Sequence, residues 1–219
     1  WLTHRRSRSN SQAKNPSSLT LSQTIQQLKQ HPTFIRVGLQ NMFASAGGMI
    51  WVLGCPIFFV EQLRWQPDEY GLTWTMITFT AGMTGALSNR WLIKRCSMDT
   101  IINAMTAVLV CAGLALFFIP WDQSLRATGL LTCFWIYMYA ITFLWSNFTA
   151  KAFDKSLASG PMSASIYGLM TNFGLALAAM VCASISFATV QAFATAITLT
   201  HLAGLTLNLM PIFHEKASS

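Results

Sequence analysis

The sequence predicts an all-α membrane protein with six transmembrane helices, and three observations support this fold class. First, 53% of the 219 residues are hydrophobic and only 10% are charged, whereas about 25% of the residues in a soluble domain are charged. Second, five runs without Asp, Glu, Lys or Arg each reach the roughly 20 residues with which a helix crosses about 30 Å of hydrocarbon. Third, Lys and Arg collect between these runs. The runs are residues 37–60, 70–89, 100–121, 127–150 and 156–214.

The segment before the first run, residues 1–33, predicts a cytoplasmic linker. Its beginning is rich in Ser, Arg, Asn and Gln, a composition that cannot bury a core. A short amphipathic helix is expected at about residues 21–30, because Leu21, Ile25 and Leu28 share one helical face. We interpret this helix as resting on the cytoplasmic membrane surface; a helix that docks a partner is the alternative.

The first three residues, WLT, precede an Arg-rich stretch and include no initiator Met. They have the composition expected at the end of another spanning helix. We therefore expect the chain to be a fragment that continues an amino-terminal half.

Each of the first four charge-free runs predicts one spanning helix. Gly47 and Gly48 in the first run, and Pro56 near its end, would soften or kink that helix. The expected helices cover about residues 34–60, 70–91, 99–121 and 127–150.

The last run predicts two helices rather than one. At about 1.5 Å per residue it would otherwise form a rod of roughly 90 Å, three times the thickness of a bilayer. We place the reversal near residues 189–191, although no Gly or Pro marks a turn there. The expected helices cover about residues 163–188 and 190–213, and residues 214–219 form a cytoplasmic tail.

Small residues recur at four-residue spacing in the second and fifth helices, where they let helix backbones approach closely in lipid. Such rows suit helices that move against each other, but they also occur in static bundles. The rows are Ala81 with Gly85, Gly82 with Ala86, and Gly160 with Ala164 and Gly168.

The distribution of cations predicts the orientation, because Lys and Arg are retained on the cytoplasmic side. With six helices, every Lys and Arg except Arg64 and Arg126 falls on the side of the two termini. We expect a multi-pass protein of the cell inner (plasma) membrane with both termini cytoplasmic. The net charge of +7 is then a topology signal, and nucleic acid is not an expected partner, because the cations are dispersed over loop ends.

The cysteines do not predict a disulfide framework or a metal site. All five are scattered, without a CxxC pair or a His at ligand spacing. We expect no metal, no cofactor and no catalytic residue.

Polar and aromatic residues inside the helices are candidates for lining a substrate cavity, because lipid does not favour them. Buried amides need partners, so Asn41, Asn147 and Asn172 are expected to face the bundle interior. Hydrogen bonding between helices explains these amides equally well. The cavity candidates are Asn41, Gly48, Trp51, Trp135, Tyr139, Phe143 and Asn172.

Several stretches, in order, resemble the carboxy-terminal half of a major facilitator superfamily transporter, most closely the Bcr/CflA type of multidrug exporter. One stretch, GALSNRWLIKR at residues 85–95, is similar to the second copy of the superfamily's G-x-x-x-D-R-x-G-R-R loop. It differs from that pattern in having Asn89 for Asp and Leu92 for Gly. The other stretches are CPIFFVE at residues 55–61, WQPDEYGL at 65–72 and SGPMSAS at 159–165.

The resemblance implies half of a secondary active transporter that exports drugs or small amphiphilic molecules, coupled to protons, by alternating access. Its partners would be the small-molecule substrate, the lipid bilayer and the missing amino-terminal six-helix half. Cytoplasmic anchoring is the other interpretation of the loop cations. The gating-loop candidates implied by the resemblance are Gly85, Asn89, Arg90, Lys94 and Arg95.

Two further expectations concern ionisable and nucleophilic side chains. No Asp, Glu, Lys or Arg lies in the middle of a predicted helix, so a coupling carboxylate is expected in the missing half. His201 is expected to be neutral, hydrogen-bonded and structural. An intramembrane serine protease using Ser163 or Ser165 with His201 is an alternative, but no glycine-flanked nucleophile motif is present. A channel is a second alternative, without a filter-like loop.

Overall fold

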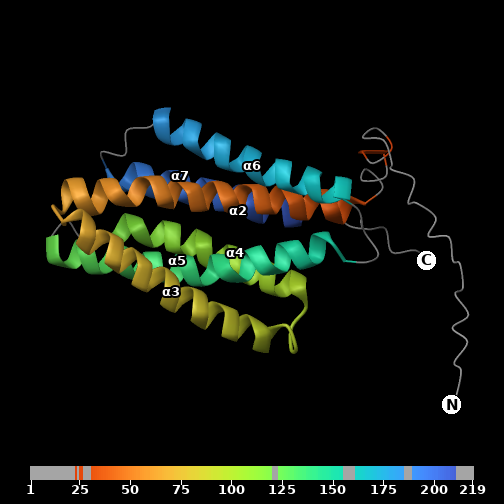
Figure 1. Cartoon of the computed structure of the whole chain (residues 1–219), viewed down its shortest axis with the longest axis horizontal. Helices are drawn as coiled ribbons and strands as arrows, with labels where there is room; N and C mark the ends of the chain where they lie inside the picture. The colour runs from red at the N-terminus through yellow and green to blue at the C-terminus, as the bar shows by residue number, and fades with distance from the viewer. Residues whose placement is uncertain are drawn as a thin grey trace, which may run out of the picture.

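The computed structural model describes residues 31–119, 123–154, 161–184 and 189–210, together with Gln23, Ile25 and Gln26. Within these residues the chain forms six long α-helices and no strand (Figure 1), which confirms the predicted all-α class. The helices are α2 (Pro32–Pro56), α3 (Pro67–Leu92), α4 (Met98–Ala115), α5 (Gln123–Ala152), α6 (Pro161–Ser184) and α7 (Val190–Thr206).

Four helical stretches are long and apolar enough to cross a membrane, which supports a membrane protein. They are Pro32–Gln62, Met98–Phe118, Leu125–Ala152 and Pro161–Ser184. The other two long helices, α3 and α7, are not among these four stretches. Most of the expected linker, 1–33, and the tail, 214–219, lie outside the described residues.

The helix ends follow from local hydrogen bonds that satisfy free backbone N–H groups. Gln66 and Glu69 form a capping box at the start of α3, and the Ser97 side chain accepts from the backbone N–H of Thr100 at the start of α4. Thr189 does the same for Ala192, at 3.3 Å, so α7 begins at Val190 as predicted. A threonine cap, rather than Gly or Pro, marks this boundary.

The end of α2 departs from a regular helix. Pro56 carries no N–H to donate to the preceding turn, and a π-helix, Ile57–Gln62, follows it. The backbone N–H of Leu63 then donates to the carbonyl of Phe58 at 2.9 Å, and Arg64 takes a positive φ of 61°. The first apolar segment therefore extends to Gln62, beyond the predicted residue 60.

Four helices, α2, α4, α5 and α7, form the core of the bundle, and α3 and α6 flank it. In the core, α2 packs against α5 and α7, and α4 packs against the same two helices. The flanking helix α3 packs mainly on α5, and α6 mainly on α2, on opposite sides of the core (Figure 1). We call α2, α4, α5 and α7 the core helices and α3 and α6 the flanking helices.

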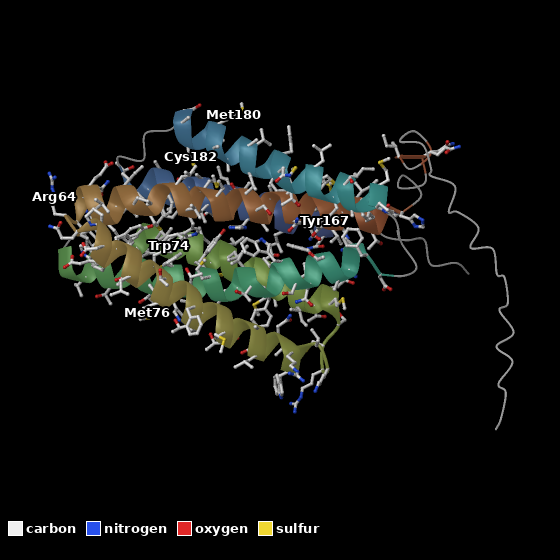
Figure 2. All side chains as sticks on the ribbon, in the orientation of Figure 1. Arg64, Trp74, Met76, Tyr167, Met180 and Cys182 are labelled. Atoms are coloured by element: carbon white, nitrogen blue, oxygen red, sulfur yellow. The ribbon has the colours of Figure 1, made fainter. Side chains whose placement is uncertain are left out.

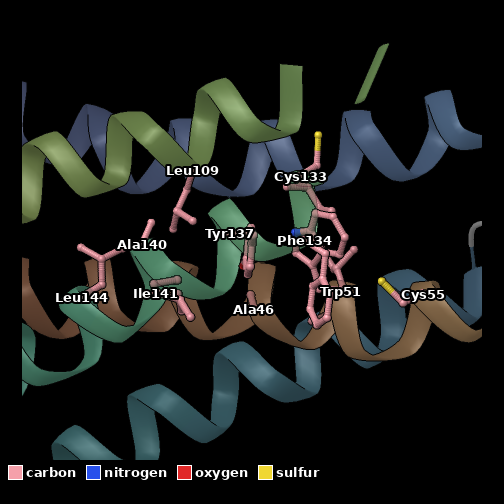
Figure 3. Close-up of a cluster of buried hydrophobic side chains, with 14 of the residues drawn as sticks. Ala46, Trp51, Cys55, Leu109, Cys133, Phe134, Tyr137, Ala140, Ile141 and Leu144 are labelled. Atoms are coloured by element: carbon pink, nitrogen blue, oxygen red, sulfur yellow. The ribbon is translucent and has the colours of Figure 1, made fainter. Parts of the chain in front are cut away.

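Aromatic rings fill the middle of the core (Figure 3). Trp51 of α2 is 1% exposed, and its ring lies 5.0 Å from those of Tyr137 and Phe193 and 5.6 Å from that of Phe134. These rings come from α2, α5 and α7. Large buried aromatic side chains contribute much of the packing energy in such a core, so they fix the three helices relative to one another.

A buried hydrogen bond joins α5 and α7 beside this cluster. The hydroxyl of Tyr137 and Nε2 of His201 are 2.9 Å apart, and His201 is 1% exposed. The imidazole lies directly against Gly47 of α2, where a Cβ would come within 2.3 Å of Nε2. The expected hydrogen bond of His201 is thus confirmed, its purely structural role stays a prediction, and the position of the ring requires Gly at residue 47.

Charged and polar side chains connect the core helices at one end of the bundle. Arg36 of α2 donates to Asp99 of α4 at 3.0 Å and to Asn208, just after α7, at 2.9 Å. Lys151 of α5 also pairs with Asp99, and Asn208 donates to Asn103. This end cluster therefore joins all four core helices.

Candidate substrate-facing surface on α3 and α5

Three aromatic side chains form a row along α5. Trp135, Tyr139 and Phe143 are spaced by four residues, so their side chains lie above one another on a helix. The rings of Trp135 and Tyr139 are stacked, with centroids 5.5 Å apart and an interplanar angle of 12°. Tyr139 and Phe143 are 5.1 Å apart at 59°. Trp135 and Tyr139 are partly exposed, whereas Phe143 is fully buried.

This aromatic row lies beside α3. Nε1 of Trp135 donates to Oγ1 of Thr80 at 3.3 Å. One turn further along α3, a Cβ on Gly85 would lie 3.1 Å from the backbone carbonyl of Tyr139. Gly85 and Ala81 are the buried residues of α3, as the first small-residue row predicted, whereas nothing lies within 4 Å of a Cβ on Gly82 or Gly168 of the other two rows. The close approach of Gly85 to the backbone of Tyr139 and the hydrogen bond from Trp135 to Thr80 together hold the row against α3.

An amide pair closes one end of the row. Nδ2 of Asn147 donates to Oδ1 of Asn89 at 2.8 Å and to the backbone carbonyl of Phe143, also at 2.8 Å. Asn147 is 2% exposed. The alternative of interhelical hydrogen bonding therefore holds for Asn147, and Asn89, at the Asp position of the loop motif, has its partner within this chain.

The other cavity candidates lie apart from the row. Nδ2 of Asn41 donates to Oγ1 of Thr171 at 2.7 Å, between α2 and α6, so its expected interior position is confirmed. Asn172 is exposed, and its predicted interior position is wrong, because Gly174 and Ala178 form the buried face of α6. Gly174 makes the closest approach there.

Trp51 and Gly48 contact the core instead of α3. Trp51 is enclosed by the aromatic cluster, and a Cβ on Gly48 would lie 3.9 Å from the Tyr137 hydroxyl. Phe143 is likewise buried. Trp51 and Phe143 are therefore buried, whereas Gly48, Trp135 and Tyr139 are partly exposed. The assignment of all these residues to a substrate cavity stays a prediction.

The loop candidates divide into a buried and an exposed part. Gly85 packs on α5 and Asn89 bonds to Asn147, as described above. The side chains of Arg90, Lys94 and Arg95 are exposed, and the Arg95 guanidinium lies 4.0 Å from the centre of the Trp91 ring. The candidates therefore do not act as one cluster.

Sequence reasoning missed two features. The end cluster brings together Arg36, Asp99 and Lys151, which are far apart in sequence, and its signal was an Asp at the start of an apolar run. The bond from Trp135 to Thr80 was also missed. The hydroxyl of Thr80 also donates to the carbonyl of Met76 in its own helix, as that of Thr84 does to Thr80, so residue type gave no sign of a second partner.

Comparison of the chain with protein-family models, with curated proteins and with solved structures gives no match.

Proposed function

We propose that this chain is one half of a secondary active transporter of the major facilitator superfamily type, exporting drugs or small amphiphilic molecules by alternating access. In this proposal all six helices cross the inner membrane, with both termini cytoplasmic. Four helical stretches have the required length and composition. The helices α3 and α7 would complete the set as neighbours of α5 and α2.

The observation that carries the proposal is the partly exposed, stacked pair Trp135 and Tyr139. Flat aromatic faces suit planar amphiphilic or cationic ligands, through stacking and cation–π attraction. The pair also carries the phenol hydroxyl of Tyr139, whereas the indole N–H of Trp135 is already donated to Oγ1 of Thr80. Lipid tails gain little from such polar groups, so a ligand or water-filled cavity is the more favourable neighbour.

In the proposal, a second six-helix half completes the cavity. The aromatic row lies on α5 beside the flanking helix α3. Its partly exposed rings would form one wall of the cavity, and the second half would supply the opposite wall. Among the described residues, the ionisable groups Arg36, Asp99 and Lys151 are paired with one another at the end of the bundle. A coupling carboxylate that exchanges protons within the membrane is therefore assigned to the other half.

The protease alternative receives no support from the hydrogen bonds of its candidate residues. The hydroxyl of Ser165 donates to the carbonyl of Pro161 at 3.0 Å, within its own helix. Nε2 of His201 is paired with Tyr137. A catalytic pair needs the nucleophile and base within hydrogen-bonding reach of each other, so the proposal assigns no enzymatic activity.

Export from cells that produce the complete transporter of this proposal, which is this chain with its second half, tests the proposal. Efflux of ethidium, a planar amphiphilic cation, should be lowered roughly tenfold by Trp135→Ala with Tyr139→Ala, about 1.4 kcal/mol. The matched control is Trp145→Ala, because Trp145 is on the same helix and half exposed. Export by the purified 219-residue chain alone in liposomes, or equal efflux by both variants, would contradict the proposal.

A further inference from the structure

The turn between α3 and α4 carries three cations and one tryptophan within six residues. Arg90 and Trp91 lie in the last turn of α3, and Lys94 and Arg95 follow it. The backbone N–H of Arg95 donates to the carbonyl of Leu92 at 2.9 Å, and that of Lys94 donates to the carbonyl of Trp91 at 3.4 Å. These bonds hold the cations in a fixed turn. We call Arg90, Trp91, Lys94 and Arg95 the basic turn.

The basic turn has an unbalanced positive charge. All four side chains are exposed, and within the described part of the chain none of the three cations has an acidic partner. The next carboxylate along the chain, Asp99, already pairs with Arg36 and Lys151. A cation at a helix carboxy terminus is favourable by itself, but one would suffice for that role.

Trp91 provides the second half of the surface. Its side chain is 53% exposed, and the Arg95 guanidinium lies 4.0 Å above its ring. Tryptophan prefers the boundary between lipid headgroups and acyl chains, and stacking on the indole leaves the charge of Arg95 available. The pair therefore sits where a charged headgroup would meet the bilayer.

An apolar track continues from Trp91 along the outer side of α3. Met83 is 52% and Leu87 is 64% exposed, and both precede Trp91 at four-residue steps. Residues at this spacing share one helical face. Cations at the end of an apolar track are complementary to a molecule with an anionic head and apolar chains. A soluble anion would contact the cations but not Met83 and Leu87.

We propose that the basic turn and this track form a binding site for an anionic phospholipid, with the phosphate held by Arg90, Lys94 and Arg95 and an acyl chain along Met83 and Leu87. The inference uses the membrane orientation of α3 that is part of the proposed function. It does not depend on transport, because its readout is lipid binding.

Native mass spectrometry of the purified full chain tests the site with two lipids, phosphatidylglycerol and phosphatidylcholine. The unchanged chain should retain phosphatidylglycerol preferentially. The variant Arg90→Gln with Lys94→Gln and Arg95→Gln should lower that preference at least about tenfold, since each surface cation contributes about a fivefold factor toward an anionic membrane. The control Arg5→Gln with Arg6→Gln and Arg8→Gln removes the same number of positive charges outside the proposed site and should lower the preference much less than the basic-turn variant does.

Three results would overturn the proposal: no preference in the unchanged chain, an equal fall in both variants, or displacement of the lipid by inorganic phosphate. The last result would identify a general anion site. If the triple variant does not yield folded protein, Lys94→Gln alone replaces one exposed side chain and should lower the preference about fivefold. An unchanged preference in that variant would equally contradict the site. Failure of ethidium export with intact lipid preference would reject the transporter assignment alone.

Discussion

The core helices and the flanking helices are joined in different ways. Between core helices, large aromatic rings interlock, as around Trp51, and a cluster of charged and polar side chains ties their ends together. The flanking helices approach the core through small residues, Gly85 of α3 and Gly174 of α6, and also pack rings on it, such as Trp74 of α3 on Phe134 and Tyr167 of α6 on Phe34. Most of their remaining side chains are at least partly exposed (Figure 2). Each core helix is packed against at least two others, whereas a flanking helix contacts the core mainly along one side and leaves its other faces free for lipid, ligand or another chain.

The largest expected effect comes from opening the core. Trp51→Ala should lower the free energy of unfolding by about 3 to 5 kcal/mol, the usual cost of removing a large buried aromatic side chain. Trp145→Ala is the matched change at a half-exposed position and should cost less than about 1 kcal/mol. Reversible unfolding in mixed micelles measures both. Equal losses would remove the distinction between core and surface.

A smaller effect is expected where α6 docks on α2. A Cβ at Gly174 would lie 2.3 Å from the backbone carbonyl of Met42, while nothing lies within 4 Å of a Cβ at Gly168. Gly174→Ala should therefore destabilise the protein by about 1 to 3 kcal/mol through overpacking. Gly168→Ala should be neutral or stabilising, since Ala is the better helix former. The same unfolding measurement compares them, and a reversed order would reject this docking geometry.

The end cluster should respond to loss of its one carboxylate. Asp99→Asn leaves the nearly buried Arg36 and Lys151 facing each other without a counter-charge. Because Asp99 is half exposed, we expect a loss of about 1 to 2 kcal/mol, less than for a fully buried pair. Asp154→Asn, at an exposed position, is the control. Identical melting of the two variants would show that the cluster does not stabilise the core helices.

The smallest effect is expected at the aromatic row. Thr80→Val removes the acceptor for Trp135 and should cost at most about 1 kcal/mol of stability. It should still raise the KM for ethidium export about threefold, because the indole loses its fixed orientation. Thr84→Val is the control, since its hydroxyl donates only to carbonyls of its own helix. A KM that is unchanged by Thr80→Val would mean that the row needs no positioning by α3.

The sequence was informative about helix positions and much less about helix faces. Charge-free runs located the helices to within a few residues, because length and charge are local properties, whereas the threonine cap at Thr189 was not recognised. In a membrane helix, however, the side facing the core and the side facing lipid are both apolar, so periodicity does not show which residues are buried. Asn41 and Asn172 look alike in sequence, yet one is buried and the other exposed.

The candidate site was predictable in part for the same reason. Trp135, Tyr139 and Phe143 could be grouped because four-residue spacing on one helix is a local rule. Their neighbour Thr80 is 55 positions away in the chain. The end cluster likewise joins Arg36 to Asp99 across 63 positions. Such partners are set by how the helices pack, which single-helix patterns do not contain.

The central claim, that the aromatic row of α5 faces substrate, is tested most directly by protection of a single cysteine. In the proposed complete transporter, which is this chain with its second half, Tyr139→Cys in a cysteine-free background should react with a membrane-impermeant maleimide and be protected by ethidium. Trp145→Cys, on the same helix and half exposed, should face lipid and stay unlabelled with or without ethidium. Labelling of Trp145→Cys together with an inert Tyr139→Cys, or labelling of Tyr139→Cys that ethidium does not slow, would contradict the claim.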